Sequence, residues 1–195
     1  MASDLAKALG EKLGNQDAKD WDLQHDLAIA AEGIQQIVDG KEKLKELADQ
    51  YLVKSRNAFY IGRGIDHAVA LEGALKLKEV SYIQTEGFAA AELKHGTISL
   101  IEDGTPVIAL INDPVTADLT RGNIQEVASR GASVITIVGK EFANSDDTIV
   151  LPEINYYMSA LLTVVPTQLL AYYASKDKGL DVDKPRNLAK SVTVE

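Results

Sequence analysis

The chain has 195 residues, of which 46% are hydrophobic and 25% charged. This balance predicts one folded globular domain, with or without an appendage, and excludes wholesale disorder. Its 20 Lys and Arg residues are outnumbered by 29 Asp and Glu residues, giving a net charge of −9, which argues against general binding to nucleic acid phosphates.

Several further classes of protein are excluded by residues that the sequence lacks. Without cysteine there are no disulfides, thiolate metal sites or cysteine nucleophiles. The three histidines, His25, His67 and His95, show no metal-binding spacing, so we expect neither a metal nor a cofactor. No apolar run reaches the ~18 residues of a membrane span, and the first residues lack a signal peptide, so we expect a cytoplasmic protein that does not bind membranes.

The first 55 residues predict helices, because apolar residues recur at helical spacing in three stretches. Leu5, Leu9 and Leu13 form the first stripe. The stripes of the second and third stretches, which meet near Gly40, comprise Leu23, Leu27, Ala30, Ile34, Val38, Leu44, Leu47 and Tyr51. We expect all three stripes to pack on the body of the domain or on a partner subunit.

Strands and helices alternate from residue 57 onward. The predicted strands are 58–61, 81–85, 106–111, 134–138 and 148–151, and the predicted helices are 66–81, 89–94, 116–130 and 155–176. Strands continuous in Val and Ile predict a parallel sheet covered on both faces, so we expect an α/β fold: a doubly wound, flavodoxin-like sheet of about five strands flanked by helices. Pro166 is expected to kink or break the last helix. The expected organisation is N-terminal helices (1–55) packing on a core domain (56–180), followed by an irregular polar tail (181–195).

Gly62-Arg63-Gly64 follows the first predicted strand, where open α/β sheets commonly bind ligands. Glycines there allow a backbone to approach a phosphate closely. The segment completes neither a dinucleotide-binding nor a P-loop motif. A plain tight turn and a phosphate-binding loop both remain open.

Glu72, Lys76 and Glu79 fall on one face of the predicted helix 66–81, while the small and apolar residues Ala70, Ala74, Leu77 and Ser81 fall on the opposite face. The charged stripe is either a solvated set of ion pairs or the equipment for moving a proton next to a carbonyl.

Two further residues carry the same ambiguity. His95 precedes Gly96 and is either a helix cap or a group that titrates near neutral pH. Lys190 in the tail is either a solvated lysine or, if it is folded over a cleft, an amine that attacks a carbonyl.

Two segments resemble a known family. The sequence LEGALKLKEVSYIQTEGFAAAELKHGTISLI at 71–101 and the terminal DVDKPRNLAKSVTVE at 181–195 are similar to the glutamine–fructose-6-phosphate aminotransferases (glucosamine-6-phosphate synthases), and the similarity extends over nearly the whole chain. The resemblance implies a sugar-isomerase (SIS) type of α/β domain, the second of two such subdomains that follow a glutaminase domain in the family. It implies an isomerising transaminase that converts fructose 6-phosphate and glutamine-derived ammonia to glucosamine 6-phosphate.

The resemblance also implies roles for individual residues. Glu79 matches the glutamate that moves a proton between C1 and C2 of the sugar, with Glu72 and Lys76 as its companions. Lys190 matches the lysine that forms a Schiff base with the open-chain ketose. His95 matches a histidine that assists ring opening in the neighbouring subunit's site, which implies at least a homodimer.

The resemblance further implies that Ala189, with Lys190, contacts the substrate, and that Leu188 and Ala189 line the path of ammonia. The sequence departs from the family at two points. The chain lacks the cysteine of the glutaminase, and its loop 62–66 lacks the hydroxyl side chains that hold a sugar phosphate in family members and includes the acidic Asp66.

We therefore expect the first SIS subdomain and the glutaminase domain to be necessary partners, and this chain to be inactive alone. The alternative is a non-catalytic SIS module for sugar-phosphate sensing or dimerisation.

Overall fold

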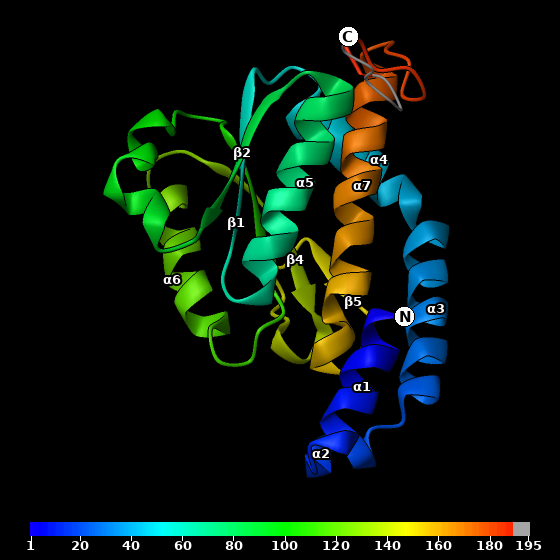
Figure 1. Ribbon diagram of the computed structural model, residues 1–195. Helices are drawn as coiled ribbons and strands as arrows, with labels where there is room; N and C mark the ends of the chain where they lie inside the picture. The colour runs from blue at the N-terminus through cyan, green and yellow to red at the C-terminus, as the bar shows by residue number, and fades with distance from the viewer. Residues whose placement is uncertain (189–195) are drawn as a thin grey trace, which may run out of the picture.

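The computed structural model describes residues 1–188. The fold is built around one parallel sheet of five strands (Figure 1). The strand order is β2-β1-β3-β4-β5, and every pair of neighbours runs parallel. The strands are β1 (Asn57–Gly62), β2 (Gln84–Ala89), β3 (Pro106–Ile111), β4 (Ser133–Gly139) and β5 (Ile149–Leu151). The chain adds β2 on one side of β1 and then β3 to β5 on the other, which confirms the doubly wound α/β fold expected from the sequence.

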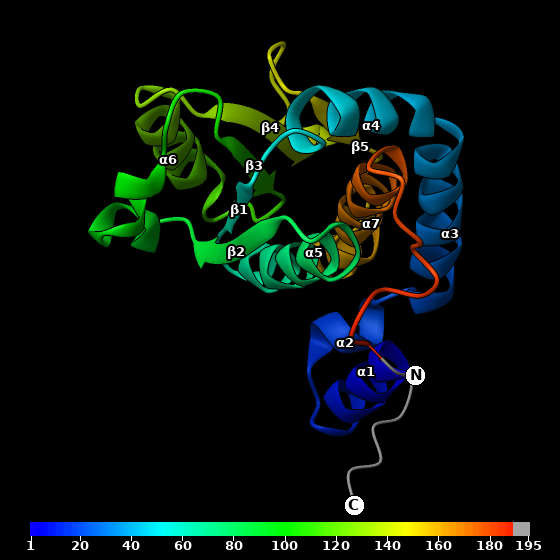
Figure 2. The same ribbon diagram turned by 90° about the horizontal axis from the view of Figure 1, so that it is seen from above.

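Helices cover both faces of this sheet. Within residues 1–188 the α-helices are α1 (Ala2–Lys12), α2 (Gln16–Asp20), α3 (Leu23–Asp39), α4 (Lys41–Leu47), α5 (Ile65–Ser81), α6 (Ala117–Ala128) and α7 (Ser159–Asp177). The short helical turns are the π-helical η1 (Ala48–Leu52) and the 3₁₀ turns η2 (Glu92–His95), η3 (Thr97–Leu100), η4 (Lys140–Phe142) and η5 (Tyr156–Met158). Figure 2 shows α5 and α7 on one face of the sheet and α6 on the other, with α3 flanking α7.

The side chains of β1 alternate between two apolar clusters, as the two-residue period of a strand requires. Ala58 and Tyr60 belong to the cluster beneath α5 and α7, whereas Phe59 and Ile61 belong to the cluster on the face covered by α6. Because both faces are buried at the central strands β1 and β3, these strands need apolar residues at nearly every position, and this explains their continuous apolar runs in the sequence.

Helix α5 packs closely between β1 and α7. A Cβ atom at Gly73 would lie 2.9 Å from the Tyr60 ring and 3.0 Å from the Cβ of Thr167. Only glycine fits there without a shift of its neighbours, so the position of α5 relative to the sheet is tightly defined.

Two local predictions are wrong. The expected strand 81–85 is shifted along the chain, because α5 extends to Ser81 and β2 begins only at Gln84. The segment 89–94 was expected to be a helix, but β2 extends to Ala89 and only the 3₁₀ turn η2 follows. The alanines there favour a helix, yet pairing of β2 with β1 up to the Gly62–Ala89 pair overrides that preference. At Pro166, where a kink or a break is expected, α7 does not end but continues from Ser159 to Asp177.

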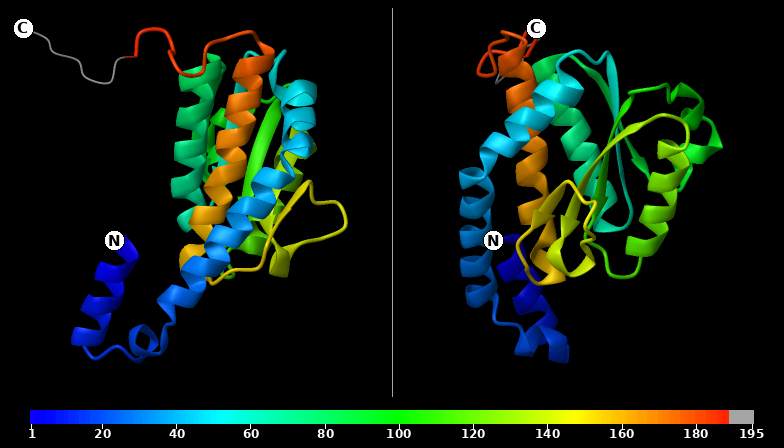
Figure 3. Two further views of the ribbon diagram at one scale, coloured as in Figure 1. Left: turned by 90° about the vertical axis from the view of Figure 1, so that its right-hand side faces the viewer. Right: turned by 180° about the vertical axis from the view of Figure 1, so that it is seen from behind.

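The three N-terminal stripes have different outcomes. Leu44 and Leu47 of α4 are buried in the main core, together with residues of α3 and η1. Leu5, Leu9 and Leu13 are 69%, 54% and 76% exposed, so the first stripe does not pack on the body of the domain in this chain. Figure 3 shows α1 standing apart from the sheet and its flanking helices.

Candidate active site

The structure has two polar regions that could bind a ligand, at opposite ends of α5. The first, which we call the carboxyl-edge crevice, lies where β1 and β3 end and comprises Gly62–Gly64, Asp66, Asn112 and Asp113. It is the point where the strand order changes direction, the usual ligand site of such sheets. Gly64 has a φ of 55°, and a Cβ atom there would collide with the Asp113 carboxylate.

The crevice is filled by its own side chains. Asp66, only 2% exposed, accepts hydrogen bonds from the backbone N–H of Asn112 (2.6 Å) and from its Nδ2 (2.9 Å). Asp113 accepts hydrogen bonds from the N–H of Val115 (2.8 Å) and from the Tyr156 hydroxyl (3.2 Å). Burial raises the pKa of Asp66, although its hydrogen bonds from Asn112 act in the opposite direction. Asp66 thus joins α5 to β3 and does not face an incoming phosphate.

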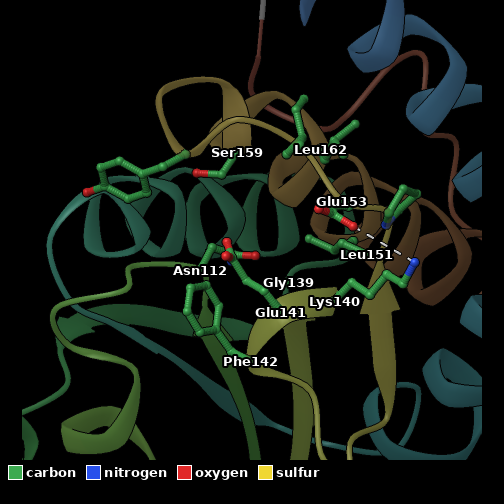
Figure 4. Close-up of a pocket in the computed structure, with 12 residues that line it drawn as sticks. Asn112, Gly139, Lys140, Glu141, Phe142, Leu151, Glu153, Ser159 and Leu162 are labelled. Carbon is green, nitrogen blue, oxygen red and sulfur yellow. Dashed lines mark ion pairs between the residues drawn. The ribbon is translucent and has the colours of Figure 1, made fainter. Parts of the chain in front are cut away.

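Beside the crevice, a small cavity lies at the carboxyl ends of β3, β4 and β5 (Figure 4). Its volume is about 10 Å³, enough for about one water molecule. The buried Ser159 hydroxyl, on its lining, has no hydrogen-bond partner within residues 1–188. Lys140 and Glu153 form an exposed ion pair of 4.0 Å at its edge. The cavity therefore has no room for a sugar.

The second polar region begins with the charged stripe of α5. Lys76 Nζ donates a hydrogen bond to Glu79 Oε2 at 2.8 Å and lies 3.7 Å from Glu72 Oε1. These side chains are between 30% and 43% exposed, whereas Ala74 and Leu77 on the opposite face are buried. The hydrogen bond to Glu79 raises the pKa of Lys76, against the smaller opposing effect of burial, so its ammonium stays protonated. The structure therefore brings together the three charged residues singled out on this helix.

The tail extends this region into a groove. Figure 3 shows the tail leaving the end of α7 and crossing the end of α5. The α5 groove, as we call it, is an open depression of about 320 Å³. It is lined by Leu75, Lys78, Glu79, Tyr82, Arg186, Asn187 and Leu188. Glu79 and Leu188 thus share one depression, while Ala189 and Lys190 lie outside the described residues.

His95 is not brought near Glu79 within the chain. It lies exposed in η2, on the face covered by α6, whereas Glu79 lies on α5 at the opposite face. Strand β2 separates the two positions, and its six residues extend over about 17 Å. A site containing both side chains would need a second subunit.

Two residues of the groove, Tyr82 and Arg186, were not identified from the sequence. They lie 104 residues apart and meet only through the path of the tail. The aromatic residue directly after the charged helix was the one local signal available. Within residues 1–188 no cluster of three His, Asp or Glu side chains is arranged to hold a metal ion, and no helix is long and apolar enough to cross a bilayer.

The fold and its site define the class of protein. Residues 51–175 match the SIS domain family, so the chain belongs to that family of α/β domains. Within it, the chain is similar to glutamine–fructose-6-phosphate aminotransferases (isomerising). It is 60% identical to that of Streptococcus pneumoniae and 58% identical to that of Lactiplantibacillus plantarum, over 98% of the chain in both cases. The chain spans about a third (32%) of the length of these curated relatives.

Solved structures support the same assignment. The C-terminal domain of glucosamine-fructose-6-phosphate aminotransferase from Francisella tularensis superposes with a TM-score of 0.76 at 32% identity, covering 87% of this chain and 48% of that one. A glucosamine-6-phosphate deaminase from Thermotoga maritima superposes with a TM-score of 0.70 at 22% identity, covering 98% of this chain and 56% of that one. The second likeness concerns the fold alone.

Proposed function

We propose that this chain provides the second SIS subdomain of a glucosamine-6-phosphate synthase. The proposed reaction converts fructose 6-phosphate and glutamine-derived ammonia to glucosamine 6-phosphate, in the cytoplasm. The observation that carries this proposal is the α5 groove, in which the Glu79 carboxylate, paired with an ammonium, shares one depression with Leu188, two residues before Lys190. Similarity to the aminotransferases over nearly the whole chain supports the choice of substrate.

The short sequence distance between Leu188 and Lys190 supports Lys190 as the reactive amine. A chain advances at most about 7 Å over two residues. Because Leu188 lines the same groove as Glu79 and precedes Lys190 by two positions, we propose that the amine of Lys190 acts at this groove. Ala189 is proposed to contact the sugar, and Leu188 and Ala189 to line the path of ammonia.

The proposed chemistry assigns one task to each group. The neutral amine of Lys190 attacks the C2 carbonyl of the open-chain ketose, and loss of water leaves an imine. Ammonia then replaces the lysine at C2 and releases its amine. The Glu79 carboxylate takes a proton from C1, which forms a C1–C2 double bond, and returns it to C2 while the C1 hydroxyl becomes the aldehyde.

The neighbours of Glu79 support this role. Lys76 holds the carboxylate through the 2.8 Å hydrogen bond and places positive charge beside the electron-rich intermediate. Glu72 forms a second, partly exposed ion pair with Lys76, with 3.7 Å between Oε1 and Nζ. His95, exposed on the other face of the sheet, is proposed to assist ring opening in a partner subunit of a homodimer.

We propose that the chain alone does not turn over substrate. Loop 62–66 has no hydroxyl side chain, Arg63 donates its hydrogen bonds to Asn123 (3.0 and 3.3 Å), and Asp66 is buried against Asn112, so the carboxyl-edge crevice lacks the hydroxyl groups proposed to hold the sugar phosphate. A first SIS subdomain is proposed to provide that group, and a glutaminase domain to provide ammonia. With glutamine and fructose 6-phosphate, the purified 195-residue chain should form no glucosamine 6-phosphate.

Chemical trapping tests the central assignment. The full-length parent enzyme is incubated with fructose 6-phosphate and sodium borohydride, which reduces an imine to a stable amine, and the modified peptide is mapped by mass spectrometry. We expect the adduct on Lys190 and none on Lys78 or Lys184. An adduct on another lysine would remove Lys190 from the mechanism. The absence of any adduct would favour the alternative, a non-catalytic SIS module.

A further inference from the structure

Tyr82 ends α5 in an unusual backbone conformation. Its φ and ψ of 60° and 17° are left-handed, and its N–H donates to the carbonyl of Lys78 as the helix ends. Glycine is the common residue at such a position, and a bulky side chain there is uncommon. A tyrosine therefore indicates that the ring has a use beyond ending the helix.

Both parts of the Tyr82 side chain contact the tail. The guanidinium carbon of Arg186 lies 4.0 Å from the centre of the ring, a cation–π arrangement. The backbone N–H of Arg186 donates a hydrogen bond to the Tyr82 hydroxyl at 2.8 Å. We call this pair of contacts the tail latch.

The latch sits at the point where the tail turns. Asn187, with a φ of 62°, and Tyr82 are the two non-glycine residues with positive φ within residues 1–188. The N–H of Leu188 donates to the carbonyl of Pro185 and closes a turn around Arg186 and Asn187. The turn leaves Leu188 on the lining of the α5 groove.

The tail latch also connects residues 181–188 to the rest of the molecule. The hydrogen bonds of Asp181 to the N–H groups of Asp183 and Lys184 stay within the tail. Among the hydrogen bonds of residues 181–188, the one from Arg186 to Tyr82 connects the tail to another element. The latch therefore fixes where the tail crosses α5.

We propose that Tyr82 and Arg186 are positioning residues for the isomerisation. They hold the turn 185–188 over the end of α5, so that the reactive part of the tail meets the substrate on the same side as Glu79. The reaction readout of this inference rests on the proposed function. The contact itself can be tested without it.

The first experiment measures the contact in the 195-residue chain. Trypsin cleaves after arginine and needs an extended segment, so the latched turn should protect the Arg186–Asn187 bond. In Tyr82→Gly, which suits the left-handed backbone, and in Tyr82→Ala we expect cleavage of this bond to be at least about fivefold faster. Tyr172→Ala is the matched control, because it removes an exposed tyrosine that holds a lysine, Lys176, over its ring on α7. Equal cleavage in both Tyr82 variants, the control and the wild type would overturn the latch.

The second experiment measures the positioning role in the full-length parent enzyme. For Tyr82→Ala and Arg186→Ala we expect kcat and the rate of borohydride trapping to fall about tenfold or more, with the KM for fructose 6-phosphate changing less than about twofold. Tyr82→Phe keeps the cation–π contact and loses the hydrogen bond, so its rate should lie between those of Tyr82→Ala and the wild type. The double variant should be no slower than Tyr82→Ala alone, because Tyr82→Ala already removes both contacts, whereas Arg186→Ala leaves the backbone hydrogen bond in place.

The outcomes separate the two proposals. If the wild type forms no adduct on Lys190, the proposed function fails, while trypsin still decides whether the latch exists. If the adduct forms and Tyr82→Ala traps and turns over like the wild type, the positioning role is wrong even where cleavage is faster.

Discussion

The carboxyl-edge crevice and the α5 groove lie at opposite ends of the same helix and differ in how their polar groups are paired. In the crevice, Asp66 and Asp113 are buried and accept hydrogen bonds from neighbours within the fold. At the groove, Glu79 lines the open space and is paired with Lys76, and both side chains are about a third exposed. The usual ligand site of this fold is thus occupied by its own side chains, while the opposite end keeps charged groups accessible.

Under the proposed function, this difference separates a structural use of charge, at Asp66, from a chemical one, at Glu79. A buried carboxylate that is fully hydrogen-bonded stabilises the connection between two elements, and removing it leaves its partners unsatisfied. A partly exposed carboxylate beside an ammonium adds little to stability and remains able to exchange a proton with a substrate. The two regions should therefore respond in opposite ways to substitution.

The largest effect is expected from Glu79→Gln. The amide cannot accept the C1 proton as a base, so kcat of the full-length parent enzyme should fall at least about 100-fold. The melting temperature should be nearly unchanged, because the lost ion pair is partly exposed. Glu46→Gln, on the exposed face of α4, is the control and should leave kcat unaltered. A loss of kcat below about threefold would contradict the role of Glu79 as the base.

Asp66→Ala should show the opposite behaviour. It removes two hydrogen bonds to Asn112 and leaves a buried N–H unpaired, so the free energy of unfolding should fall by about 2–4 kcal/mol. Urea denaturation of the 195-residue chain measures this change. Asp118→Ala, in the first turn of α6 and exposed, is the matched control for the favourable effect of an acid near a helix start. Equal stability of the two variants would show that Asp66 acts only through the helix dipole.

The pH dependence of stability sharpens the same comparison. Burial raises the pKa of Asp66 above its ordinary value of 3.8, so folding takes up protons between the two values. The contribution of Asp66 is fully present below pH 3.8 and is lost as the pH rises through the raised value. The difference in unfolding free energy between the wild type and Asp66→Asn should therefore decrease with rising pH. A difference that grows instead would mean that the hydrogen bonds from Asn112 outweigh burial.

Much of the fold could be predicted from the sequence because its signals are local. The apolar run Pro106–Ile111 is a strand with the same bounds in the structure, and the charged stripe of α5 faces away from the sheet as its spacing implies. Segment 89–94 could not be predicted, since its alanines favour a helix and only pairing with β1 makes Ala89 part of a strand.

The candidate site was less accessible to sequence reasoning. Glu72, Lys76 and Glu79 share a helix, so their proximity follows from helical geometry. The contact of Tyr82 with Arg186 depends on where the tail crosses α5, and no local pattern encodes it. The same holds for Asp66, whose carboxylate accepts a buried hydrogen bond from Asn112, 46 residues away in the sequence.

The smallest effect is expected at a buried polar group that has no hydrogen-bond partner. Tyr60 lies in the core between the two regions, fully buried, and its hydroxyl has no hydrogen-bond partner within residues 1–188. Burial raises the pKa of Tyr60, so the hydroxyl keeps its proton and stays an unused donor. Tyr60→Phe removes this polar group without leaving a cavity, and it should raise the free energy of unfolding by about 1 kcal/mol and the melting temperature by about 2–4 °C.

Tyr173→Phe is the matched control for that substitution. Tyr173 is also in the core, at 7% exposure, but its hydroxyl is not among the buried groups without a partner. Its removal should leave the melting temperature unchanged or lower it slightly. If Tyr60→Phe is instead destabilising while Tyr173→Phe is neutral, a water molecule must reach the Tyr60 hydroxyl. This buried group would then be hydrogen-bonded, as the carboxylates of the carboxyl-edge crevice are.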